Sequence, residues 1–339
     1  MKWLIPFGIL AFFGLIGFAM QVYRYTEPFV ITTYSMGSAV QQTLYGPGAS
    51  EAALAVSEGV NRLEHLISYK IEDSDIRKLN QNAGGSFEWI NAPTYQLLQL
   101  ATDVYEISGG AFDISIAPVS QLWDFDSERK IIPDAALIES LLRYVDGSTV
   151  KLLPDGTAAL RDEGAAIELG AIGKGAACDA AVSIYETEDI SCGIVAVGGS
   201  VGVYGKKLWN QPWKVAVRDP NTAGSMGELS IEEGFLSTSG DYEKAFEADG
   251  VRYHHLLDPK TGYPVHSGLR SVTVWSTGGA LSDALSTAAF VLGPQESRAV
   301  LETYGAEAIF ITDDNEVLVT DGLSDRFTLT SDDYHLREQ

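Results

Sequence analysis

The chain has 339 residues, of which 45% are hydrophobic, and it carries 46 acidic residues against 23 basic ones. This length and apolar fraction argue against disorder and predict one large folded domain or two smaller ones. The formal net charge of −23 disfavours nucleic-acid binding, because an acidic surface repels phosphate backbones. A nucleotide ligand would need a cation or well-placed backbone N–H groups to hold its phosphates.

An uncharged apolar run, WLIPFGILAFFGLIGFAM, occupies residues 3–20. A membrane-spanning helix needs roughly 20 apolar residues, whereas a secretory signal has a shorter core and a small-x-small exit, which Gly17-Phe18-Ala19 would fit. Residues 1–24 are therefore expected to be a membrane anchor or a signal segment, and the length of the run favours the anchor. No cysteine follows it, which argues against a lipoprotein. Residues 25–335 are expected to form the folded domain, on the periplasmic side of the inner (cytoplasmic) membrane.

The first half of the chain is largely helical in pattern. Residues 22–45 are interpreted as a linker followed by a strand. Apolar residues at helical spacing predict a helix over 49–68. A second helix is expected over 91–108, where Pro93 suits a first turn, and a third within 133–145.

Short β-branched runs separated by turns dominate after residue 148, interrupted by two glycine-led helices at about 173–186 and 279–292. The chain therefore predicts an α+β fold: one compact domain with a largely antiparallel sheet, helices and a central cleft. The two cysteines, Cys178 and Cys192, lie in apolar stretches. They are expected to be free buried thiols, because no metal-binding spacing such as CxxC is present.

The stretch IELGAIGKGAACDAAV, residues 167–182, leads from an apolar segment into a helix through three glycines, with Lys174 between the last two. Glycines allow the backbone to approach a ligand closely, and a helix N-terminus offers free N–H groups to a phosphate. The spacing matches neither a P-loop nor GxGxxG. A plain strand-to-helix turn would contain the same glycines, so both interpretations stay open.

In LSDALSTAAFVLG, residues 281–293, Asp283 and Thr287 lie four residues apart and so share one face of a helix. Both offer oxygen to a hard cation such as Mg²⁺, which takes few protein ligands and completes its shell with water and phosphate. The alternative is an aspartate stabilised by the helix dipole and a threonine bonded to its own backbone.

Three further stretches contain polar groups in or beside turns. In SGGAFDISIAP, residues 108–118, Phe112 is a core candidate and Asp113, at the start of an extended run, either caps a turn or contacts a ligand. STSGDYEKAF, residues 237–246, is expected to be a turn that opens a short helix. In YHHLLDPKTGYP, residues 253–264, His255 is either structural or a proton acceptor three residues before Asp258.

Seven segments, MGS (36–38), SGGAFDISIAP, ELGAIGKGAACD, AVGGSVGVYG, STSGDYE, HHLLDPKTGYP and SDALSTAAFVLG, occur here in one order. In these motifs and their order the chain resembles the ApbE-type FAD:protein FMN transferases, formerly called thiamine-biosynthesis lipoproteins. The resemblance covers roughly residues 30–330 and implies an ApbE-like, T-fold-related fold.

The resemblance implies a Mg²⁺-dependent enzyme that binds FAD, transfers its FMN half to a Ser or Thr hydroxyl of a target protein and releases AMP. The implied targets are flavin-accepting subunits of Na⁺-translocating NADH:quinone reductase or of Rnf-type complexes. Two alternatives remain: a Mg²⁺-dependent FAD pyrophosphatase, and a membrane-tethered flavin-binding protein without catalysis.

The resemblance also assigns roles to residues. It implies metal ligation by the backbone oxygen of Ala171 and by Asp283 and Thr287, with Ser286 as an additional candidate. It implies that His255 activates the incoming hydroxyl, with Asp258 beside it in the catalytic loop. The implied cofactor contacts are Met36, Tyr69, Ala111, Phe112, Asp113, Glu168, Lys174 and Leu257. The chain departs from the family pattern at Ser38 (usually Thr), Glu168 (usually Asp) and Ser200 (commonly acidic).

Overall fold

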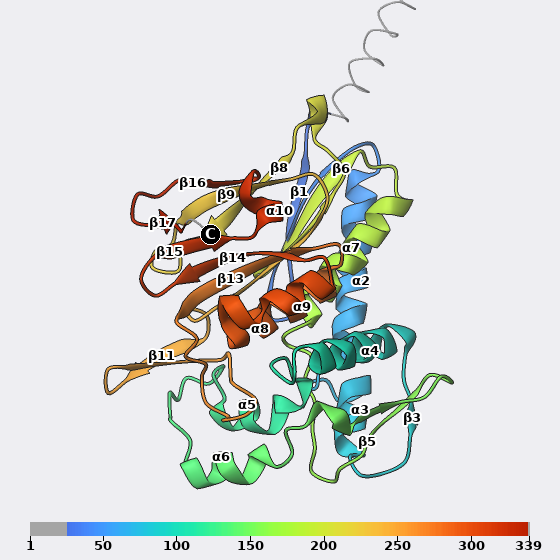
Figure 1. The fold of residues 1–339 in the computed structure, drawn as a ribbon. Coiled ribbons are helices and arrows are strands. Elements are labelled where there is room, and N and C mark those ends of the chain that lie inside the picture. Colours follow the sequence, from blue (N-terminus) through green and yellow to red (C-terminus); the bar gives the residue numbers. More distant parts are fainter. Residues whose placement is uncertain (1–25, 338–339) are drawn as a thin grey trace, which may run out of the picture.

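The computed structural model describes residues 26–337 and shows a mixed helix-and-sheet domain (Figure 1). Its main sheet has nine strands in the order β1-β2-β6-β7-β10-β13-β14-β15-β17. Every neighbouring pair in it is antiparallel except β15 with β17. The strands are β1 Phe29–Ser35, β2 Ser38–Tyr45, β6 Cys192–Val197, β7 Ser200–Tyr204, β10 Gly234–Gly240, β13 Leu269–Ser276, β14 Glu307–Thr312, β15 Glu316–Val319 and β17 His335–Leu336.

Helices cover one face of this sheet. Helix α2 packs on β1 and β2, α7 on β6 and β7, and α8 on β10 and β13 (Figure 1). The helices are α2 Ala49–Ile67, α3 Asp75–Gln81, α4 Ala92–Ile107, α5 Ala117–Trp123, α6 Ala135–Leu142, α7 Gly173–Thr187, α8 Gly279–Glu296, α9 Arg298–Thr303 and α10 Asp321–Ser324.

A smaller sheet covers the other face. It has the order β16-β9-β8, with β8 Trp213–Arg218, β9 Ser225–Ile231 and β16 Phe327–Leu329. Successive side chains of a strand point to opposite faces, so β10 contributes Phe235 to the helical core and Leu236 to the core between the sheets. The remaining strands form the sheets β3-β5-β4 and β11-β12: β3 Glu88–Trp89, β4 Val150–Leu152, β5 Thr157–Leu160, β11 Ala245–Ala248 and β12 Val251–His254.

The expected α+β class, the antiparallel sheet and the principal helices are confirmed. Pro93 lies in the first turn of α4, and both cysteines are buried and free. The expected anchor or signal segment, residues 1–24, lies outside the described residues. Within 26–337, none of the helices is long and apolar enough to cross a bilayer.

Three local expectations were wrong. Residues 22–45 contain two strands rather than one, because Met36 and Gly37 adopt φ of 55° and 66° and turn β1 back into β2. Residues 237–246 contain no helix, because Ser237 and Ser239 pair with β13 within the main sheet. Residues after Asp113 are helical rather than extended, because the Asp113 side chain caps a 3₁₀ turn, Ile114–Ile116, that leads into α5.

Candidate functional site

The N-terminal turns of α7 and α8 cross in direct contact through two glycines. The amide of Gly175 donates to Asp283 Oδ2 at 2.9 Å. A Cβ atom on Gly175 would overlap the carbonyl of Gly279, and one on Gly279 would overlap the carbonyl of Gly175. Glycine is therefore required at both positions by close backbone approach, and this approach places a carboxylate at the start of α7.

Asp283 is 4% exposed, and hydroxyl groups from neighbouring strands surround it. Ser200 Oγ, from β7, lies 3.3 Å from Asp283 Oδ1 and accepts a hydrogen bond from Ser237 of β10 at 3.0 Å. Ser237 also shares a hydrogen bond with Ser282 of α8 at 2.9 Å. Because the carboxylate is met by one amide and one distant hydroxyl, its oxygens keep free lone pairs.

Thr287 lies one helical turn beyond Asp283 and is half-buried. Ser239 Oγ of β10 lies 3.3 Å from Thr287 Oγ1 and 2.8 Å from Ser286 Oγ. Ser286 also donates to the backbone carbonyl of Asp283 at 2.9 Å. Ser286 is thus committed to the protein's own groups, and Thr287 is the freer of the two hydroxyls.

The carbonyl of Ala171, just before α7, is a further oxygen donor beside this contact. Ala171 precedes the N-cap residue of α7, Ile172, and the amide of Gly175 in the first turn donates to Asp283 rather than to a carbonyl. Within 26–337 no donor to the Ala171 carbonyl is found. A backbone oxygen, a carboxylate and a hydroxyl are the donor types that Mg²⁺ accepts, so Ala171, Asp283 and Thr287 fit that ion. The described residues contain no cluster of three or more His, Cys, Asp or Glu side chains arranged to hold a metal.

Lys174 connects this region to the β1–β2 hairpin. Its ammonium donates to the carbonyl of Gly170 at 3.2 Å. A Cβ atom on Gly198, in the turn between β6 and β7, would lie 3.2 Å from Lys174 Cδ and 2.7 Å from Ser38 Oγ. The hairpin turn that contains the half-buried Met36 is therefore beside the first turn of α7.

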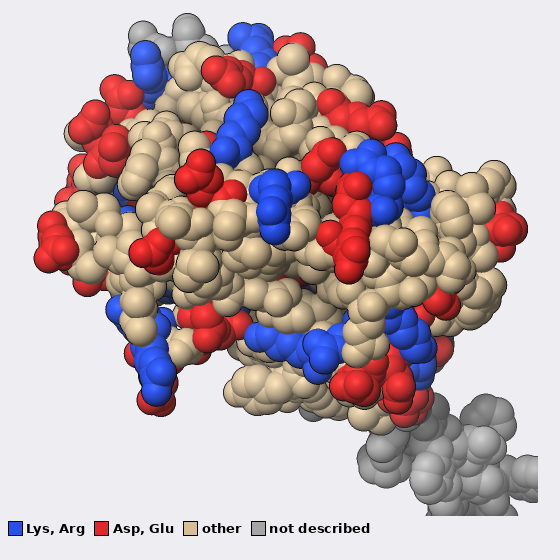
Figure 2. Space-filling view, turned by 90° about the horizontal axis from the view of Figure 1, so that it is seen from below, with Lys and Arg blue, Asp and Glu red and all other residues tan. Residues whose placement is uncertain are grey.

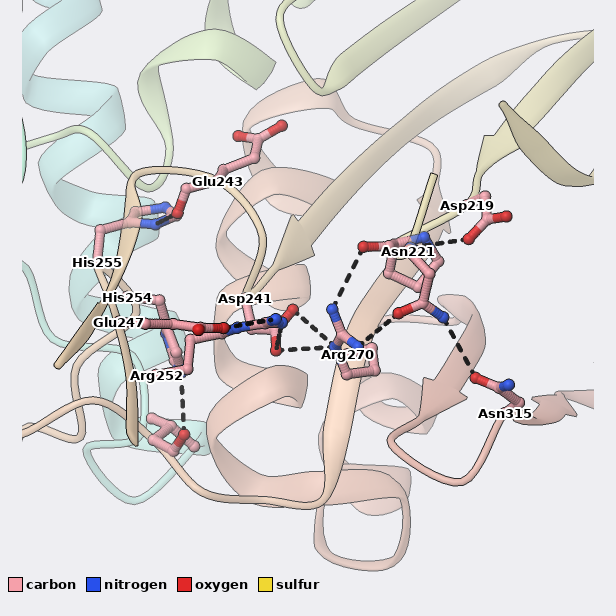
Figure 3. Close-up of polar contacts among 12 residues, drawn as sticks. Asp219, Asn221, Asp241, Glu243, Glu247, Arg252, His254, His255, Arg270 and Asn315 are labelled. Carbon is pink, nitrogen blue, oxygen red and sulfur yellow. Dashed lines mark hydrogen bonds and ion pairs between the residues drawn. The ribbon is translucent and has the colours of Figure 1, made fainter. Parts of the chain in front are cut away.

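His255 lies directly after β12, and its Nδ1 atom is 3.0 Å from the backbone oxygen of Glu243 (Figure 3). A carbonyl only accepts, so Nδ1 carries the proton and Nε2 has the lone pair. Burial lowers the pKa of His255 to about 4; the hydrogen bond to Glu243 opposes this shift, and the positive charges of Lys174 and Lys244 add to it. The imidazole is therefore neutral at physiological pH and lies within electrostatic reach of α7.

The loop that supplies the Glu243 carbonyl is held by an ion pair. Arg270 Nε lies 3.0 Å and 2.9 Å from the two carboxylate oxygens of Asp241, and Arg252 adds a contact at 3.2 Å (Figure 3). His254, on the other side of β12, is buried and bonds to the carbonyl of Val265 at 3.1 Å. Of the two adjacent histidines, His254 is thus a core residue.

Tyr69 and Glu168 lie in a neighbourhood rich in lysine. Asp126 bridges Lys70 at 2.9 Å and Lys244 at 2.8 Å, and hydrogen bonds from Lys244 and Lys70 lower the pKa of Asp126 to about 2. Burial, and then the negative charge of Glu168, raises the pKa of Tyr69. Burial also raises the pKa of Glu168, while a hydrogen bond from Ser120 and then the charges of Lys244 and Lys70 oppose the rise. Lys70 and Lys244 are thus paired with a shared carboxylate beside Tyr69 and Glu168. On the face in Figure 2, basic and acidic side chains are interspersed.

Other residues expected at the site already have partners within the protein. The carboxylate of Asp113 accepts from Ser115 on one oxygen and from the Gly147 amide on the other. Asp258 accepts from the Lys260 amide at 2.9 Å and closes the turn after His255. Ala111, Phe112 and Leu257 are buried, at 4%, 1% and 7% exposure. The structure therefore shows Phe112 and Leu257 as core residues and the two carboxylates as groups bonded within their own loops.

Sequence reasoning did not single out Lys70, Asp126, Lys244 or Asp179. The first three are charged residues in loops far apart in the chain, and no local pattern connects them. Asp179 does have a signal, since GAACD at 175–179 repeats the Gly-x-x-x-Asp spacing of GALSD at 279–283.

Comparison with known proteins places the chain among relatives of one family. The model of the ApbE family matches residues 36–310. An FAD:protein FMN transferase of Treponema pallidum (strain Nichols) is 33% identical over 298 residues, 82% of each chain. One of Klebsiella pneumoniae (strain 342) is 30% identical over 308 residues, 89% of this chain and 94% of that protein.

Solved structures support the same relationship. The crystal structure of the ApbE protein of Thermotoga maritima superposes with a TM-score of 0.80 at 29% identity, covering 88% of this chain and 99% of that one. The apo flavinyl transferase ApbE of Pseudomonas stutzeri gives 0.78 at 26% identity, covering 90% and 98%. The extent of these matches and the family model together show that the chain belongs to the ApbE family.

Proposed function

We propose that this protein transfers the FMN half of FAD to a Ser or Thr hydroxyl of an acceptor protein and releases AMP. Several relatives are named FAD:protein FMN transferase. The observation that carries the proposal is the contact between Asp283 and the Gly175 amide, 2.9 Å, because it places an open carboxylate beside the helix N-terminus that bears Lys174.

The difficulty of the reaction is negative charge on the diphosphate inside an acidic protein. The first turn of α7 offers N–H groups, and Lys174 offers a positive charge, to the diphosphate of FAD. Ala171, Asp283 and Thr287 would hold Mg²⁺, which when bound neutralises part of that charge. These groups would act by position and electrostatics, which dominate catalysis of phosphoryl transfer.

The acceptor oxygen attacks the phosphorus on the FMN side, and the P–O bond to AMP breaks. His255 Nε2 takes the proton of the attacking hydroxyl, since Nδ1 already donates to Glu243. The pKa of His255 is low in the free protein, and the negative charge of bound FAD would raise it. A positioned base of this kind contributes typically about 10²–10⁴-fold.

The ring systems of FAD would contact Tyr69, Glu168 and the turn that contains Met36. Residues 1–24 would anchor this domain in the inner membrane, with the site facing the periplasm. The acceptors would be flavin-carrying subunits of Na⁺-translocating NADH:quinone reductase or of Rnf-type complexes.

Co-expression with such a subunit tests the proposal. Mass spectrometry should find the acceptor heavier by one FMN, and an acceptor without its Ser or Thr hydroxyl should stay unmodified. Incubation with FAD alone separates the alternatives. Rapid release of both AMP and FMN without an acceptor would indicate a pyrophosphatase, and FAD binding without release or adduct would indicate a flavin-binding protein.

A further inference from the structure

Helices α7 and α8 cap each other reciprocally. Gly175 and Gly279 lie in the two first turns, and an aspartate follows each glycine four residues later. Asp283 of α8 accepts from the amide of Gly175 in α7. Asp179 of α7 accepts from the amides of Gly279 and Ala280 in α8, at 2.6 Å and 2.7 Å. Each helix thus supplies the carboxylate that caps the other.

The two carboxylates differ in the donors that they meet. Both oxygens of Asp179 are engaged by backbone amides. Asp283 meets only one amide, and its second oxygen has only the Ser200 hydroxyl at 3.3 Å. Both carboxylate oxygens of Asp179 are therefore used in capping α8, whereas the carboxylate of Asp283 keeps lone pairs that can bind another ligand.

We propose that Asp179 is a positioning residue for the reaction: its cap on α8 fixes Asp283 and Thr287 relative to the Ala171 carbonyl. This inference rests on the proposed function. Orphan amides at a helix N-terminus need acceptors, and the Asp179 cap satisfies two of them. Asp283 begins the next turn of α8, so loss of the cap would loosen the three oxygen donors relative to one another.

The experiment compares Asp179→Ala, Asp179→Asn and a matched control, Asp134→Ala. Asp134 caps α6 by accepting from the Ala136 amide at 2.8 Å, and it is exposed and outside the site. Each purified protein is titrated with Mg²⁺ alone while its thermal midpoint is followed, and FMN transfer is then measured across the same Mg²⁺ range.

We expect Asp179→Ala to raise the Mg²⁺ concentration for half-maximal stabilisation by about 10- to 100-fold, as is typical when the support of a metal ligand is removed. Asp179→Asn, which keeps one acceptor oxygen, should give a smaller rise. Asp134→Ala should lower the thermal midpoint without changing the Mg²⁺ requirement, which separates positioning from general stability.

If Asp179→Ala does not fold, the Mg²⁺ requirement of Asp179→Asn is compared with that of the wild type instead. An unchanged Mg²⁺ requirement in the folded Asp179 variants would overturn the inference, and so would a wild-type protein whose thermal midpoint does not respond to Mg²⁺. Wild-type transfer to the acceptor in the same assay shows separately whether the proposed function holds.

Discussion

His255 Nδ1 donates a hydrogen bond to the backbone carbonyl of Glu243 across 3.0 Å. The hydrogen-bond acceptor is a main-chain carbonyl, so protonation of the Glu243 side chain cannot remove this hydrogen bond. The contact fixes the tautomer, and Nε2 is the only ring atom able to take a proton. Asp241, paired with Arg270, holds the start of the loop that provides this carbonyl.

The first prediction concerns His255 as a base. His255→Gln should slow FMN transfer by about 10²–10⁴-fold, because the amide cannot accept the hydroxyl proton. FAD binding should persist, as measured by quenching of flavin fluorescence. His65→Gln is a matched control, since exposed His65 also places Nδ1 on a backbone carbonyl, 2.8 Å away, in α2. An unchanged transfer rate in His255→Gln would make this histidine structural.

The lowered pKa of His255, about 4 when folded, predicts a pH-dependent stability difference. An unfolded histidine titrates near pH ~6.5, so between these values the unfolded state binds the additional proton. The stability that neutral His255 provides is present above pH ~6.5 and is lost as the pH falls toward 4. Urea unfolding across this range should show wild type losing stability relative to His255→Gln. A constant difference would contradict the burial argument.

Two substitutions at Asp283 separate its contact with α7 from its charge. Asp283→Asn keeps an oxygen for the Gly175 amide, so urea unfolding should show it to be more stable than Asp283→Ala. Both should lose FMN transfer, and FAD binding should weaken without vanishing.

Chelation of divalent ions should abolish wild-type transfer, and added Mg²⁺ should restore it. Full activity of Asp283→Ala with Mg²⁺ would refute the metal assignment.

The glycine contact between α7 and α8 predicts a large effect from one methyl group. Gly175→Ala should lower the free energy of unfolding by about 1–3 kcal/mol or more, because the added Cβ meets the Gly279 backbone. Gly170→Ala is the control, since its Cβ would have no atom within 4 Å. Equal urea midpoints for the two variants would contradict this prediction, because they would show that α7 and α8 can move apart to admit the methyl group without a loss of stability.

Several features followed from local pattern alone. The spacing of apolar residues located α2 and α4, and β-branched runs located β6, β13 and β14, because core-facing periodicity is a property of consecutive residues. Asp283 and Thr287 were placed on one helical face by their spacing. Local pattern failed at 237–246, where the pairing of β10 with β13 outweighed the capping signal.

The sequence by itself determined the α+β class, the glycine-led helices and the motif order that marks the family, since each is encoded in short stretches. Only the tertiary structure decided that α7 and α8 cap each other, that the Ala171 carbonyl lies beside their contact and that His255 is held by Glu243. Gly175 and Asp283 are 108 residues apart, and packing of both helices on one sheet brings them into contact. Packing likewise sets burial and neighbouring charge, and these determine protonation.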